Sequence, residues 1–382
     1  MFRLPSILVT ALIASLSLVG AAHAVTPVPK APTINARSYL LVDFNSGRVL
    51  AEHNADERVE PASLTKLMTA YVVFKELKEG RLKLTDLVTI SERAWKMEGS
   101  RTFLDVGSQV PVEVLIKGMI VQSGNDATVA LAERVGGTEA AFVQVMNEYA
   151  SRLGMKNTHF ADSAGMPHPD TYTTARDLAT LSRALIEEFP DYYKWYSIRE
   201  FTWNKIKQQN RNGLLGRDPS VDGIKTGHTE SAGYCLVTSA NRDGMRLISV
   251  VMGTSSFKAR EDASAALLNY GYTFYETVKV KGAGEAVLKP RVFKSDEEFV
   301  DVGTSSDIYV TVARGEGAKL TTSTTLNEPL IAPLGKGQAV GELVVTNSQG
   351  EVVARAPIAP FKEVPEGSLW TRMIDSVMLW FE

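Results

Sequence analysis

The sequence predicts a mixed α/β (α+β) domain, in which helices pack on an antiparallel sheet, followed by a small all-β domain. Along the first two thirds of the chain, strand patterns give way to helical patterns and then return. This order is typical of a sheet covered by helices. Near residues 282–290 the composition shifts to short alternating stretches rich in Val and Thr, separated by Gly-rich turns, which favours a β domain. We expect the two domains to span 25–285 and 286–364.

The first elements are a strand at 38–44, a turn at 45–47 and a return strand at 48–52. Pro61 then stands at the start of a helix expected to run to residue 77. Its apolar residues recur at helical spacing: Leu67, Met68, Tyr71, Val72 and Phe74. The spacing predicts a mostly buried helix.

A helical pattern covers 112–153, broken by a short polar loop at 122–125, and another covers 174–188. Beyond Pro190 the pattern predicts three strands, at 221–225, 233–240 and 246–252. A helix at 257–275 closes the first domain. Its apolar face consists of Ala263, Leu267, Tyr270 and Phe274.

The N-terminal residues 1–24 have the pattern of a secretory signal peptide. Arg3 precedes an apolar run, and the small residues Ala22 and Ala24 follow it. This arrangement predicts cleavage after Ala24 and export of the protein. The alternative is an uncleaved membrane anchor.

The C-terminal residues 365–382 form an amphipathic pattern. One helical stripe is apolar: Leu369, Trp370, Met373, Ile374, Val377, Trp380 and Phe381. The segment is too short to span a bilayer, and its aromatic residues favour a helix lying in the membrane interface. A helix docked on its own protein, or a dimer seam, is the alternative, and the sequence does not fix the oligomeric state.

Composition excludes several classes of function. The formal net charge is -3 and the pI is about 6.1, so no basic field predicts nucleic-acid binding. Cys235 is the single cysteine, which rules out an intramolecular disulfide and favours a small core residue in a buried strand. The five histidines show no paired ligand spacing, so we expect no metal site and no cofactor.

Ser63 and Lys66 form a Ser-x-x-Lys pair at the first turn of the predicted 64–77 helix. A serine hydroxyl is a weak nucleophile until a base removes its proton. Lys66, three residues further along one helix face, is placed to be that base, provided that burial or a second cation lowers its pKa. Ser255 and Lys258 form another Ser-x-x-Lys pair with no matching context, so the motif alone does not identify an active site.

Two further segments follow in order. Ser123 lies 60 residues after Ser63, and Asn125 follows two positions later; a hydroxyl there can relay a proton, and an amide can bind a peptide bond. Read alone, this segment is a plain turn before a helix.

Lys225, Thr226 and Gly227 follow 102 residues later on a predicted strand. The lysine and threonine can bind a substrate carboxylate, and the glycine leaves room for an extended substrate. The alternative interpretation is an exposed strand with a solvated lysine. Arg211 is a second candidate for binding that carboxylate; the alternative is that it is an ordinary surface arginine. Together the three segments predict a serine acyl-transferase with a lysine base.

With these motifs, the chain resembles the low-molecular-mass penicillin-binding proteins, in particular the D-alanyl-D-alanine carboxypeptidases of Gram-negative bacteria. The resemblance covers almost the whole length, from signal peptide to C-terminal helix. It implies a penicillin-recognising serine transferase domain with catalytic residues Ser63, Lys66, Ser123, Asn125 and Lys225. It further implies an oxyanion hole from the backbone N–H groups of Ser63 and His228, and a carboxylate site that includes Lys225, Thr226, Gly227 and Arg211.

The implied reaction removes the last D-alanine from a peptidoglycan pentapeptide, which limits cross-linking, and β-lactams would acylate Ser63. The implied location is the periplasmic face of the inner membrane, with a peripheral anchor through the C-terminal helix. Residues 95–107 lie where the family has a flexible loop beside the active site; here the segment is shorter.

Two rival functions remain open. A class A β-lactamase needs a glutamate in a Glu-x-x-Leu-Asn stretch; residues 200–204 are Glu-Phe-Thr-Trp-Asn and lie only 25 residues before Lys225. A penicillin-recognising sensor or wall-binding module would acylate without turnover. Release of D-alanine from a pentapeptide distinguishes the enzyme from the sensor.

Overall fold

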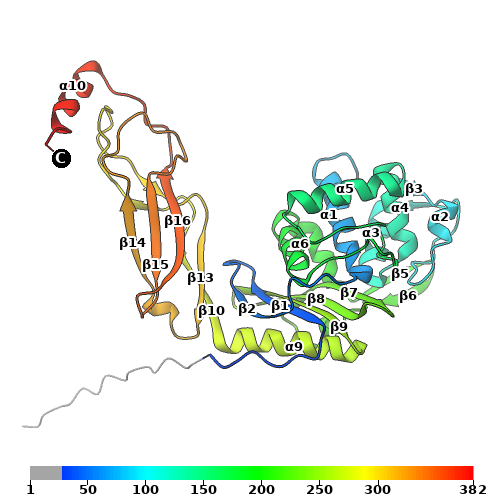
Figure 1. Cartoon of the computed structure of the whole chain (residues 1–382). Coiled ribbons are helices and arrows are strands. Elements are labelled where there is room, and N and C mark those ends of the chain that lie inside the picture. Colours follow the sequence, from blue (N-terminus) through cyan, green and yellow to red (C-terminus); the bar gives the residue numbers. More distant parts are fainter. Residues whose placement is uncertain (1–27, 382) are drawn as a thin grey trace, which may run out of the picture.

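The computed structural model describes residues 28–381 (Figure 1); the predicted signal peptide lies outside them. The first unit is built on a five-stranded antiparallel sheet in the order β2-β1-β9-β8-β7. The strands are β1 (Ser38–Asp43), β2 (Val49–His53), β7 (Val221–Thr229), β8 (Gly233–Arg242) and β9 (Met245–Thr254). The first and last strands of the unit therefore lie together in one sheet, as predicted for strands that enclose a helical middle.

Helices cover both faces of this sheet (Figure 1). The helical middle comprises η1 (Ala62–Thr65), α1 (Lys66–Lys78), α2 (Glu92–Trp95), α3 (Val112–Lys117), η2 (Gly118–Gln122), α4 (Asn125–Gly136), α5 (Glu139–Arg152) and α6 (Ala175–Glu188). On the opposite face lies α9 (Phe257–Phe274). Neighbouring strand residues enter different cores: Val250 packs with the helical middle, and Val251 packs with α9, as alternation along a strand requires.

Short elements complete the first unit. They are β3 (Leu87–Thr89) paired with β4 (Gln109–Pro111), β5 (Glu200–Trp203) paired with β6 (Ile206–Gln209), α7 (Pro190–Tyr193), η3 (Lys194–Ser197) and α8 (Leu214–Arg217). One expected helix is divided further: the 112–153 pattern breaks again between α4 and α5. Gly136 there approaches Phe142 so closely that a Cβ would lie 2.7 Å from its backbone nitrogen, and Gly137 has φ +73°. Thr138 then caps α5.

The second unit is all-β. Its sheet has the order β11-β12-β16-β15-β14, with strands β11 (Ala286–Leu288), β12 (Val302–Gly303), β14 (Thr321–Leu326), β15 (Gly341–Thr346) and β16 (Val352–Pro360). A separate antiparallel pair joins β10 (Tyr275–Lys281) to β13 (Ile308–Ala313), and η4 (Gly317–Lys319) follows. The last helix, α10 (Leu369–Met378), lies at the end of this unit remote from α9 (Figure 1). Within residues 28–381, no helix has the length and apolar character needed to cross a bilayer.

A buried polar network fastens the two units to each other. Asp43 of β1 is fully buried and accepts hydrogen bonds from the Ser46 hydroxyl (2.8 Å) and the Thr277 hydroxyl (2.7 Å). Thr311 of β13 lies 2.6 Å from the Ser46 oxygen and 2.8 Å from the Thr277 oxygen. Because buried polar groups are costly unless each has a partner, this network favours one arrangement of the units.

Candidate active site

The nucleophile candidate Ser63 lies on the short helix η1, directly before α1. Lys66 Nζ is 3.0 Å from Ser63 Oγ and 2.6 Å from the Ala164 carbonyl oxygen. The lysine side chain is almost completely buried, with 1% of its surface exposed. Ala62, the residue before the nucleophile, has φ +48°, a conformation that costs energy for a residue with a side chain and is concentrated at functional sites.

Burial lowers the pKa of Lys66 to about 7, because an ammonium ion loses its hydration there. The nearby cation Arg211 lowers the pKa further, while Asp162 and Asp126 oppose the shift. A substantial fraction of Lys66 is therefore neutral near neutral pH, which a general base requires.

A second serine–lysine pair faces the first. Ser123 lies between η2 and α4 with φ +65°, and Lys225 Nζ from β7 is 2.9 Å from its hydroxyl oxygen. The same amine donates to the Thr226 carbonyl oxygen at 2.9 Å. Burial, followed by the charges of Lys66 and Arg211, holds the pKa of Lys225 well below its ordinary value.

The three motifs meet at one cavity of about 370 Å³. Seven of the nine candidate residues line it: Ser63, Ser123, Asn125, Arg211, Thr226, Gly227 and His228. The other two, Lys66 and Lys225, lie beneath the floor, each bonded to a lining serine. A larger cleft of about 830 Å³, between the β1–β2 turn and β13, contains none of these residues.

Gly227 is required for packing as well as for access. A Cβ at this position would lie 2.9 Å from the Pro61 carbonyl oxygen and 3.2 Å from Leu64 Cγ. The strand β7 can therefore lie against η1 only because residue 227 lacks a side chain. This close approach brings Lys225 and Ser63 to the same cavity.

Asn125 and Asp126 hold the 95–107 segment against the site. The Asn125 amide donates to the Glu98 carbonyl oxygen at 2.6 Å. Asp126 is fully buried and accepts from the backbone N–H groups of Thr102 (2.8 Å) and Leu104 (3.2 Å). Asn125 Oδ1 is buried without a hydrogen-bond partner among the described residues, so it is free to accept one from a bound peptide N–H.

Arg260 is the main residue of the cavity wall that the sequence analysis missed. It is 1% exposed, and Nη1 donates to the Gly227 carbonyl oxygen at 3.2 Å. Within residues 28–381 it forms no ion pair, and burial lowers its pKa to about 10. The signal was present: Arg260 precedes Ala263 by three positions and Leu267 by seven, which places a charge on the apolar face of α9.

The fold and this cavity define a penicillin-recognising serine enzyme, in which two lysines each bond one serine. Comparison with known proteins narrows the class. The sequence model for "D-alanyl-D-alanine carboxypeptidase" matches residues 25–256, and that for "Penicillin-binding protein 5, C-terminal domain" matches residues 275–366. The chain belongs to the D-alanyl-D-alanine carboxypeptidase family.

Individual relatives agree with this assignment. The chain is 46% identical to the D-alanyl-D-alanine carboxypeptidase DacA of Escherichia coli over 96% of this chain and 94% of the relative. It is 36% identical to DacF of Bacillus subtilis over 88% of this chain and 87% of the relative. The crystal structure of penicillin binding protein 5 from Haemophilus influenzae superposes with a TM-score of 0.85 at 44% identity, covering 88% of this chain and all of that one. The predicted fold class and family are thus confirmed.

Replacement of Gly165 by alanine is expected to slow acylation by about tenfold or more. A Cβ there would lie 1.8 Å from the Ala62 carbonyl oxygen, so the residue before Ser63 must move, and small displacements of reacting groups have large effects on rate. The measurement is the rate of labelling by a fluorescent penicillin. Gly154→Ala is the matched control, since Gly154 also has positive φ (+77°) but its Cβ would meet nothing within 4 Å. Equal rates for both variants would contradict the prediction.

Proposed function

We propose that the protein removes the terminal D-alanine from peptidoglycan stem pentapeptides through an acyl-enzyme on Ser63. Lys66 takes the hydroxyl proton as Ser63 Oγ attacks the carbonyl carbon of the penultimate D-alanine. The contact of 3.0 Å between Lys66 Nζ and Ser63 Oγ, made by a buried lysine, carries this proposal. The backbone N–H groups of Ser63 and His228 stabilise the oxyanion.

The second serine–lysine pair completes the proton transfers. When the C–N bond breaks, Ser123, which Lys225 contacts at 2.9 Å, gives its hydroxyl proton to the leaving amine and takes in its place the proton that Lys66 removed from Ser63. D-Alanine then departs, and a water attacks the ester carbon of the acyl-enzyme. Lys66, neutral again, accepts a proton from that water and returns it to Ser63 Oγ as the ester bond breaks.

Cationic and polar groups of the cavity bind the substrate carboxylate. Arg211 and Thr226 line the cavity and the Lys225 amine bonds to the Thr226 carbonyl oxygen, while Asn125 binds the peptide amide. A β-lactam carries a carboxylate beside a strained amide, so it fits the same groups and acylates Ser63. The size of the cavity, about 370 Å³, suits the end of one stem peptide.

The test compares D-alanine release with covalent labelling in the same preparation. Repeated release of D-alanine from a pentapeptide supports the carboxypeptidase, whereas stoichiometric labelling without release supports the sensor. A cross-linked dimer peptide in the same assay reports any cleavage of cross-links. Against the β-lactamase alternative, no glutamate of residues 28–381 lines the cavity, and Glu200 pairs instead with Lys207 at 2.7 Å.

We propose further that the protein acts after export, at the periplasmic face of the inner membrane, and that α10 lies in the membrane interface. Its polar face is fastened to the β unit: buried Asp375 accepts from the Lys294 backbone N–H and from Arg291 Nη2. The apolar side is left exposed, with Trp370 72% and Trp380 89% accessible. Such a helix binds by inserting apolar side chains.

Replacing Trp370 and Trp380 together by serine is expected to lower binding to lipid vesicles by about tenfold or more, because each large apolar side chain contributes roughly 1.5–3 kcal/mol on burial. Cosedimentation with vesicles of bacterial lipid measures the change, and D-alanine release in solution stays at the parent value. Val352→Ser is the control, since Val352 is 47% exposed on β16. Undiminished cosedimentation of the double variant would count against the anchor.

These roles correspond to a division of the chain that we also propose. Residues 1–24 are removed on export, 25–285 carry catalysis, 286–364 form the small β domain and 365–382 the anchor. Every residue given a catalytic or binding role lies between Ser63 and His228, which supports the assignment of catalysis to residues 25–285; at the end of this segment β10 pairs with β13 of the β domain.

A further inference from the structure

The loop at residues 162–166, between α5 and α6, holds the catalytic lysine in place. Its Ala164 carbonyl oxygen accepts a hydrogen bond from Lys66 Nζ at 2.6 Å. One turn further along α1, Thr69 donates to the Ser163 carbonyl oxygen at 2.6 Å. Since Gly165 also packs against Ala62, the loop contacts residues 62–69, the segment that contains Ser63 and Lys66, at three points. Its conformation therefore determines where the lysine amine lies.

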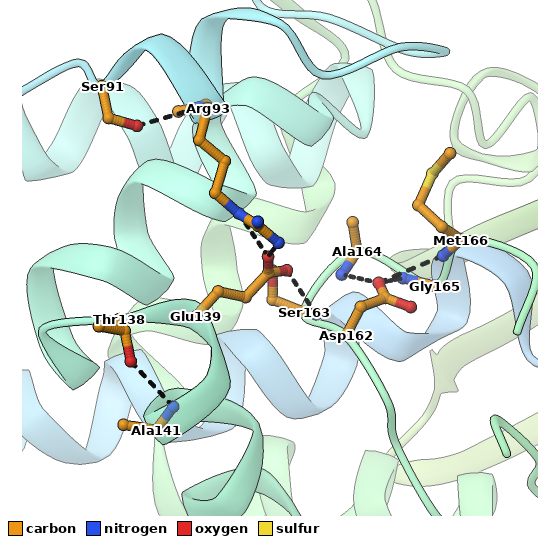
Figure 2. A network of polar contacts seen from close by, with 11 residues as sticks. Ser91, Arg93, Thr138, Glu139, Ala141, Asp162, Ser163, Ala164, Gly165 and Met166 are labelled. Atoms are coloured by element: carbon orange, nitrogen blue, oxygen red, sulfur yellow. Dashed lines mark hydrogen bonds and ion pairs between the residues drawn. The ribbon is translucent and has the colours of Figure 1, made fainter.

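Asp162 determines that conformation. One carboxylate oxygen, Oδ1, accepts from three consecutive backbone N–H groups, those of Ala164 (2.7 Å), Gly165 (2.6 Å) and Met166 (3.2 Å) (Figure 2). Three donors on one oxygen fix the intervening peptide planes, including the plane that carries the Ala164 carbonyl. Hydrogen bonds to a charged acceptor are stronger than neutral ones, so the loss of this carboxylate would free the loop.

A second carboxylate fastens the same loop from the other side. Glu139, at the start of α5, accepts from the Ser163 backbone N–H (3.1 Å) and hydroxyl (2.7 Å). It also forms an ion pair with Arg93 of α2 (Figure 2). Ser163 is thereby held from α5 and α2, while its neighbour Asp162 shapes the turn.

Asp162 also contributes charge at Lys66. The charged groups that act on the Lys66 amine are Asp162 and Asp126, which favour its protonation, and Arg211, which disfavours it; Lys225 is a further cation beside it. Among these charges, Asp162 has the largest effect on the pKa of Lys66. It raises this pKa, whereas burial of the lysine lowers it.

We propose that Asp162 is a positioning residue for acylation: through its hydrogen bonds to residues 164–166 it sets the Ala164 carbonyl that orients the Lys66 amine on Ser63. The Arg93–Glu139 ion pair holds the same loop through the hydrogen bonds of Glu139 to Ser163. This inference rests on the proposed roles of Ser63 and Lys66, and concerns how the base is held rather than which reaction follows.

The experiment separates charge from hydrogen bonding. Asp162→Asn keeps the acceptor oxygen and removes the charge, whereas Asp162→Ala removes both. The readout is the pH profile of the second-order acylation rate of the full-length protein with a fluorescent penicillin, together with the thermal unfolding midpoint. With Asp162→Asn, the rise of the rate with pH is expected to move about one unit lower, because an opposing charge is lost, with a plateau near that of the parent. With Asp162→Ala, the plateau is expected to fall about 100-fold.

Asp170→Asn is the matched control, since Asp170 lies in the same connection with its side chain 72% exposed; we expect it to keep the parent profile. The proposal is overturned if Asp162→Ala keeps the parent plateau, or if Asp162→Asn, which keeps the acceptor oxygen, loses its plateau. If Asp162→Ala does not fold, the plateau of Asp162→Asn decides. Failure of the parent to be labelled at Ser63 would instead overturn the proposed function.

Discussion

Ser63→Ala is expected to abolish both D-alanine release and β-lactam labelling, lowering kcat/KM by at least about 10⁴-fold. Lys66 contacts the Ser63 hydroxyl, and the other serine of the cavity, Ser123, is bonded to Lys225 instead. No second hydroxyl among the described residues bonds to the Lys66 amine to take over the attack. Among residues 28–381, Ser63 Oγ takes part in a single hydrogen bond, the contact with Lys66, so the fold should persist and circular dichroism should match the parent.

The control for this experiment is Ser255→Ala. Ser255 and Lys258 repeat the Ser-x-x-Lys spacing, but both are exposed and Lys258 pairs with Asp262. This variant is expected to keep the parent rate of D-alanine release. Covalent labelling that persists in Ser63→Ala would mean that the nucleophile has been misassigned.

Lys66→Arg is expected to lower the acylation rate by about 10³-fold or more at every pH from 5 to 9, since an arginine side chain stays protonated and cannot act as a base. In the parent, the rate should rise with pH around 7. Burial lowers the pKa of Lys66 to about 7: below that value the amine is mostly ammonium and cannot accept the Ser63 proton, and above it the neutral amine is available. Stopped-flow labelling with a fluorescent penicillin gives both profiles.

Lys258→Arg provides the matched control, since it makes the same exchange at an exposed Ser-x-x-Lys lysine whose side chain is 80% accessible. It should follow the parent at each pH. A parent rate that is flat between pH 5 and 9, or an active Lys66→Arg variant, would exclude Lys66 as the base.

The fold class was predicted from sequence alone, and so were the candidate residues that meet at the cavity, because both have local signals. Strands and helices have periodic patterns, and each motif places two or three chemical groups within a few residues, as with Ser63 and Lys66 on neighbouring turns. The break at Gly136 was missed because its cause is contact with Phe142, a residue whose position depends on the next helix.

Charged residues that act through packing were harder to predict. Asp162 and Glu139 look like surface acids in the sequence, and only the fold shows that they bond backbone groups around Ser163. Arg260 is similar, since its partners are carbonyl oxygens of Gly227 and Cys235. Backbone partners have no residue identity, so bonds that join a side chain to a backbone group distant in the sequence, as from Arg260 to Gly227, leave no motif.

Four basic side chains, Lys66, Lys225, Arg211 and Arg260, lie in or beneath the wall of a cavity of about 370 Å³. The positive charge that they carry attracts any small anion to the cleft, because clefts lined by one sign of charge concentrate counter-ions. Phosphate and sulfate in a buffer would then compete with the peptide terminus for the same place and would stabilise the folded protein against heat. Affinities for the substrate measured in such buffers would therefore be too low, and zwitterionic buffers are the better choice.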